Sequence, residues 1–94
     1  MKIRKVLNNN HYSIIKMETR KVIMSNGNEY ELLWDSEKID ENFYEMIDLQ
    51  KGWVKINKNF VSEIIVLGQL SEKKSIHPKV KKEIIDYYGE FYLN

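Results

Sequence analysis

Few residues of this 94-residue chain are of types and spacings that support catalysis. His11 and His77 are its only histidines, and they do not form a two-histidine metal motif such as H-E-x-x-H. Each lies beside a predicted turn, so we expect a surface or capping histidine at both positions. The four glycines are isolated, and no glycine-rich loop can cradle a phosphate. The sequence predicts no enzyme, no cofactor and no metal site.

Cysteine and carboxylate chemistry add little to this inventory. The chain has no cysteine, which excludes a disulfide framework and a thiolate metal site. Acidic side chains are frequent between residues 35 and 48, but we expect them on the solvated face of a helix, opposite Phe43 and Ile47. A carboxylate pair assembled by the fold stays open as a third, enzymatic alternative, and no pair is singled out by spacing.

A group of basic and amide side chains could contact nucleic acid. Lys51, Lys55 and Lys58 flank one predicted strand and its turn, with Asn57 between them. Lysines bind phosphates, and an asparagine amide can pair with the edge of adenine. The net charge of +1 provides little long-range attraction for DNA, so we expect a protein partner in preference to DNA.

The small net charge conceals four blocks of opposite sign. Residues 1–24 carry +5, residues 25–50 carry −7, residues 51–82 carry +6 and residues 83–94 carry −3. We expect opposite blocks to become neighbours in the fold. The alternative is that the two basic blocks form one face toward an acidic partner.

Aromatic side chains gather at the end of the sequence. Four of the eleven fall within the last eight residues: Tyr87, Tyr88, Phe91 and Tyr92. They can close the core of a small domain, but one helix face buries only some of them. Because tyrosine is enriched among interface anchors, we expect a protein interface here, with a two-fold homodimer as its simplest form.

Local patterns predict the elements that carry these groups. Residues 12–17 and 21–25 read as strands, and Asn26-Gly27 predicts a two-residue type I′ hairpin turn. That register pairs Ile23 with Tyr30. From residue 36 the apolar spacing becomes helical: Ile39, Phe43, Met46 and Ile47 lie on one stripe.

The second half repeats this order. Residues 53–56 and 60–67 predict a second hairpin, whose return strand should be central in the sheet. Pro78 suits the first turn of a second helix, for which Gly89 is a C-terminal stop. Residues 2–7 fit a strand or a short helix.

The predicted fold is therefore a single α+β domain over residues 1–94. Two β-hairpins form one mainly antiparallel sheet, with two amphipathic helices at about 36–49 and 78–88. The N-terminal residues resemble no secretory signal, and no apolar stretch is long enough to span a bilayer. We expect a cytoplasmic protein without membrane contact.

Residues 21–61 resemble the middle of LytTR-type DNA-binding domains. The shared features are a strand–turn–strand with a glycine and a tyrosine, an acidic helix, and a phrase close to F-x-R-I-H-R-S-Y-L-V-N. The phrase is matched at Trp53, Lys55, Ile56, Asn57, Lys58 and Phe60, whereas Ser62 and Glu63 replace its Val-Asn. The resemblance implies DNA binding through Asn57 and Lys58 in transcription regulation.

Two functions from different classes follow. The leading hypothesis is a non-enzymatic module that inhibits or regulates a host macromolecule by protein binding. Its bias toward Lys, Asn and Ile is typical of small proteins of phages and mobile elements. The alternative is the LytTR-like DNA-binding domain.

Overall fold

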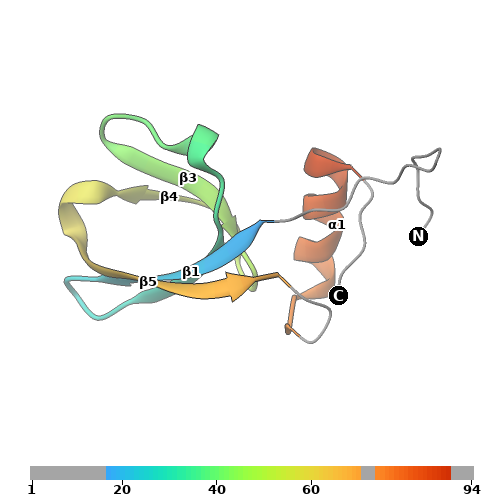
Figure 1. Ribbon diagram of the computed structural model, residues 1–94, viewed down its shortest axis with the longest axis horizontal. Helices are drawn as coiled ribbons and strands as arrows, with labels where there is room; N and C mark the ends of the chain where they lie inside the picture. Colours follow the sequence, from blue (N-terminus) through green and yellow to red (C-terminus); the bar gives the residue numbers. More distant parts are fainter. Residues whose placement is uncertain (1–16, 71–73, 90–94) are drawn as a thin grey trace.

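The computed structural model describes residues 17–70 and 74–89. Five strands, two single turns of 3-10 helix and one α-helix follow one another along the chain (Figure 1). In order they are β1 (Glu18–Met24), β2 (Glu29–Leu33), η1 (Ser36–Lys38), β3 (Phe43–Asp48), β4 (Gly52–Asn57), η2 (Lys58–Phe60), β5 (Val61–Gln69) and α1 (Pro78–Tyr88).

All five strands belong to one antiparallel sheet with the order β4-β3-β2-β1-β5. Strands β1 to β4 form a meander, and β5 then returns to pair with β1. The sheet curls on itself, and α1 lies across one end of it (Figure 1). The α+β class is confirmed, but with one helix in the described residues where two were expected.

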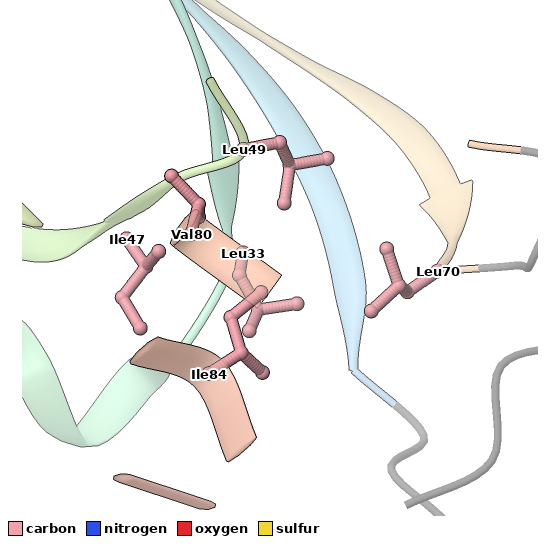
Figure 2. Close-up of a cluster of buried hydrophobic side chains, with 6 residues drawn as sticks. All are labelled: Leu33, Ile47, Leu49, Leu70, Val80 and Ile84. Carbon is pink, nitrogen blue, oxygen red and sulfur yellow. The ribbon is translucent and has the colours of Figure 1, made fainter. Parts of the chain in front are cut away.

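Each face of the curled sheet has its own apolar cluster, because successive residues of a strand point to opposite faces. The inner face buries Val22, Leu32, Met46 and Ile56. The neighbouring residues Leu33 and Ile47 point the other way and pack beneath α1. Figure 2 shows this second cluster, which is completed by Leu49, Leu70, Val80 and Ile84.

The first hairpin exists, but its turn is one residue longer than predicted. Met24 N donates to Asn28 O and Gly27 N donates to Met24 O, which leaves a three-residue loop ending in Gly27 at φ 94°. This is the usual loop that ends in a bulged glycine at positive φ. Val22 therefore faces Tyr30, and the predicted Ile23–Tyr30 pair is wrong. A one-residue shift moves every side chain to the other face, so Val22 is buried inside and Ile23 points outward.

The predicted helix at 36–49 is also wrong. Only Ser36–Lys38 form a helical turn, and residues 43–48 form β3. Asp40 Oδ1 accepts hydrogen bonds from Asn42 N and Phe43 N, which turns the chain before the strand. Met46 and Ile47, read as one helical stripe, lie on opposite faces of the sheet. Ile39, Phe43 and Ile47 share one face in either period, and pairing with β4 makes the segment a strand.

The second predicted hairpin does not form between the expected strands. β4 pairs with β3, and β5 pairs with β1, with η2 between β4 and β5. The apolar run of β5, expected at the centre, therefore lies on an edge strand. Its composition resembles a buried strand, and only the topology shows that one side is unpaired.

The C-terminal helix is confirmed from Pro78 to Tyr88. His77 Nδ1 accepts a hydrogen bond from Lys79 N, so this histidine caps the helix as expected. Gly89, at φ 90°, ends it through a hydrogen bond to Ile85 O. The predictions for residues 2–7, His11, Phe91 and Tyr92, and for residues 12–16 of the first strand, lie outside the described residues.

Candidate binding surfaces

Three aromatic rings stand in contact where α1 crosses β4. The Trp53 and Tyr87 ring centroids are 5.0 Å apart, and those of Tyr87 and Tyr88 are 4.8 Å apart, both in edge-to-face geometry. Trp53 is 39% exposed and Tyr87 is 49% exposed. Lys38 of η1 places its Nζ 4.6 Å from the Tyr87 centroid. We call Trp53, Tyr87 and Lys38 the aromatic surface.

Tyr88 belongs to the support of this surface. It packs against the cluster beneath α1, and its hydroxyl donates to Asp35 Oδ2 at 2.5 Å. Burial and this hydrogen bond raise the pKa of the Tyr88 hydroxyl far above its usual value of 10.0. The other oxygen, Asp35 Oδ1, accepts from Glu37 N and caps η1. The carboxylate of Asp35 therefore holds α1, which carries Tyr87, beside η1, which carries Lys38.

Carboxylates border the aromatic surface. The hydrogen bond with Tyr87 raises the pKa of Lys38, and the nearby charges of Asp35 and Glu45 add to this effect. The negative charge of Glu37 likewise acts on Tyr88. Lys38 and Tyr88 thus lie near three carboxylates, one of which, Glu45, also stands opposite Lys55 on the neighbouring strand. A partner that covers this surface needs an apolar side chain for the rings and basic groups around it.

The predicted nucleic-acid group is only partly brought together. Lys55 and Lys58 lie toward the same end of β4, where their ammonium groups stack over Phe43 and Tyr44 at 4.6 and 5.3 Å. Lys51 lies before the other end of the strand and stacks over Tyr30. At about 3.3 Å per residue, the backbones of Lys51 and Lys58 are separated by roughly 20 Å.

Local contacts already occupy several of these groups. Asn57 Oδ1 accepts from Asn59 N and caps η2, so adenine pairing would have to share this oxygen with the cap. Hydrogen bonds from the backbone at Asn42 and Phe43, together with the charges of Lys55 and Lys58, lower the pKa of Asp40. Asp40 therefore offsets part of the positive charge at this end of β4.

Ion pairs join charge blocks of opposite sign. Lys21 Nζ lies 3.5 Å from Glu29, and Lys74 Nζ lies 2.5 Å from Glu31. The acidic block thus borders both basic blocks at these two places, as expected from the charge pattern. Most of the first basic block lies outside the described residues.

A hollow of about 580 Å³ opens on the other side of Asp35. Trp34, Arg20 and Glu37 are among its lining residues. Arg20 stacks on Trp34 at 4.6 Å and forms an ion pair with Glu18, so its charge is already matched. Within residues 17–70 and 74–89, no group of three or more potential ligands is placed to hold a metal ion.

Sequence reasoning singled out Tyr87 and Tyr88, and the structure brings them to a common site with Trp53. It missed Lys38 and Asp35 as members of this site, because Lys38 was not singled out and Asp35 was counted among the acidic side chains of a helix that does not form. No local signal marks them. In the part of the chain that the structure describes, no helix is long and apolar enough to cross a membrane.

Comparisons with known proteins return no match: none of the protein-family models, curated proteins or solved structures searched matches the chain.

Proposed function

We propose that this chain is a non-enzymatic binding module whose aromatic surface holds a protein partner. The observation that carries the proposal is the exposed edge-to-face pair of Trp53 and Tyr87, with Lys38 over one ring. Tryptophan and tyrosine are enriched among the few residues that carry most of the binding energy at protein interfaces. Here two of them adjoin at one point of the surface.

The support beneath this surface favours binding as well. Tyr88 contacts Tyr87 and is tied to Asp35, while Trp53 is held on the sheet opposite Ile47. Side chains that are already ordered lose little conformational entropy when a partner arrives. The energy of burying the two rings is then available for affinity.

The surrounding charges select a partner with basic groups. Asp35, Glu37 and Glu45 lie near Lys38 and Tyr88, and they would repel a phosphate backbone. The same carboxylates attract a peptide segment that carries lysine or arginine beside an apolar residue. In the proposed role as a phage or mobile-element accessory protein, this segment belongs to a host macromolecule that the chain inhibits or regulates.

Quantitative affinity capture tests this proposal. Tagged wild type is incubated with nuclease-treated bacterial lysate beside Tyr87→Ala, Trp53→Ala and the control Phe60→Ala. Phe60 is 58% exposed but lies in η2, away from α1. We expect a protein that wild type and Phe60→Ala capture equally, and that both aromatic-surface variants lose by at least tenfold. Capture that persists in Tyr87→Ala and Trp53→Ala, or that occurs only in lysate not treated with nuclease, would contradict the proposal.

LytTR-like DNA binding remains the alternative proposal. Its support in the structure is that Lys55 and Lys58 lie toward the same end of β4, where they stack over Phe43 and Tyr44. Asp40 and the capping role of Asn57 oppose it. Titration with duplex DNA distinguishes the two functions.

A further inference from the structure

Strand β5 presents an apolar edge of the sheet. Within the described residues it pairs only with β1, so its second side carries unpaired backbone N–H and C=O groups. Three consecutive apolar side chains on it are exposed: Ile65 (37%), Val66 (57%) and Leu67 (41%). The groups on such an edge can bond to water or to an added β-strand, and a strand pairs with the whole row.

The two edges of this sheet differ in their protection. Edge strand β4 has six residues and carries the exposed Lys55, and a short strand with a lysine resists pairing with another chain. Strand β5 has nine residues, no lysine, no proline, and Glu63 as its one charge. Within residues 17–70 and 74–89 no strand pairs with the outer side of β5, so the described sheet can accept another strand there.

The register of β5 on β1 shows which part of this edge is regular. The pairing skips Ser62 and Leu67, which are bulged, and runs without interruption from Glu63 to Val66. When two copies of one strand pair antiparallel with the same face toward the same side, even-numbered residues face even-numbered residues and odd-numbered residues face odd-numbered ones. A two-fold axis at Ile65 meets this condition and pairs Ile65 with itself and Ile64 with Val66.

Charge placement makes this arrangement self-complementary. In it Glu63 faces the bulge at Leu67 of the other copy, and the two Glu63 side chains are separated by about four residues along the strand and one strand spacing. That is about 14 Å, which exceeds the roughly 8 Å Debye length at physiological salt. The contact buries apolar side chains without opposing like charges.

We propose that the chain forms a two-fold homodimer in which the β5 strands of two copies pair antiparallel about Ile65, joining two five-stranded sheets into one. The outer strands of the joined sheet are then the two β4 strands with Lys55, which stops further growth. The aromatic surface on α1 and β4 stays free for a partner. This assembly differs from the expected dimer through the C-terminal aromatic residues.

Molecular mass in solution is the first test. We expect light scattering to give twice the 11.3 kDa of the chain. Ile65→Lys places like charges directly opposite each other, so it should raise the dimer dissociation constant at least tenfold. The control Phe60→Lys changes an exposed aromatic residue outside the strand and should leave the dimer intact. Circular dichroism checks that both variants fold.

Crosslinking tests the register even if Ile65→Lys fails to fold. Because the chain has no cysteine, Ile65→Cys introduces a single thiol, and facing residues have Cβ atoms about 5 Å apart. We expect mild oxidation or a short bismaleimide to link Ile65→Cys into dimers and Phe60→Cys only weakly. A monomeric wild type, assemblies larger than dimers, or equal crosslinking at both positions would overturn the proposal. Loss of the dimer in Tyr87→Glu but not in Ile65→Lys would also overturn it, in favour of the aromatic cluster.

Discussion

The hydroxyl of Tyr88 donates a 2.5 Å hydrogen bond to Oδ2 of Asp35, a residue 53 positions earlier in the chain. This contact ties the last turn of α1 to the cap of η1 and so positions Lys38 and Tyr87 beside each other. Neither Lys38 nor Tyr87 belongs to a strand of the sheet. The aromatic surface therefore depends on a polar contact that joins two segments at its border.

Removing this hydroxyl should loosen the border of the aromatic surface. In Tyr88→Phe the ring remains, but Asp35 Oδ2 loses its donor. We expect a loss of about 1.5–3 kcal/mol in the free energy of unfolding, because hydrogen bonds to charged groups contribute in this range. Urea denaturation measures it. Tyr87→Phe is the matched control and should change stability by less, since Tyr87 is half exposed; an equal loss in both variants would contradict the assigned role of Asp35.

The raised pKa of Tyr88 predicts a specific dependence on alkaline pH. The unfolded tyrosine ionises near pH 10, whereas the folded one remains protonated above that pH. The associated stability is present in full below pH 10 and is lost as the pH rises toward the folded value. We expect the stability difference between wild type and Tyr88→Phe to be constant from pH 7 to 9 and to shrink above 10. A difference that stays constant to pH 11 would be inconsistent with the raised pKa.

Backbone conformation alone should determine the effect of substitutions at Gly27. Its φ is 94°, and an added Cβ would meet no atom within 4 Å. Gly27→Val should reduce stability by about 1–2 kcal/mol, because a β-branched residue is strained at positive φ. Gly27→Asn should cost less, since asparagine tolerates this region better. Thermal melting of both variants gives the comparison. An unchanged melting temperature in Gly27→Val would show that the turn does not strain a β-branched residue.

Core substitutions should separate the buried from the half-buried side chains of β3. Met46 is fully buried in the inner cluster, whereas Phe43 lies half-buried beneath Lys55. Met46→Ala should cost about 2–5 kcal/mol. Phe43→Ala should cost clearly less, although the helical reading placed Phe43 in the core. Denaturation curves decide, and a larger loss in Phe43→Ala would restore that reading.

Titration with duplex DNA at two salt concentrations tests the alternative function. We expect no measurable binding at low salt, because Asp40 and the carboxylates of the acidic block lie near Lys55, Lys58 and Lys38. Binding that weakens with salt, with a shallower salt dependence in Lys55→Ala/Lys58→Ala, would instead support DNA recognition. Fluorescence anisotropy with a labelled duplex is the measurement.

Local signals in the sequence determined the elements whose formation depends on nearby residues. Pro78 marks the start of α1 and Gly89 its end, and Asn26-Gly27 marks a hairpin turn. Proline restricts the backbone angles and glycine permits positive φ wherever they occur. The tyrosines of α1 were also visible as candidates for an interface. They are candidates because of their residue type and helical spacing, and both can be read directly from the sequence.

Only the tertiary structure decided which strands pair and which side chains meet. The spacing of Ile39, Phe43 and Ile47 satisfies both a helix and a strand, and hydrogen bonding to β4 selects the strand. The run at 64–67 looks like a central strand, yet β5 returns to β1 and stands at the edge. Asp35 and Tyr88, or Trp53 and Tyr87, meet through contacts between distant segments. Such contacts form only when the whole chain packs, so no local pattern of residues can encode them.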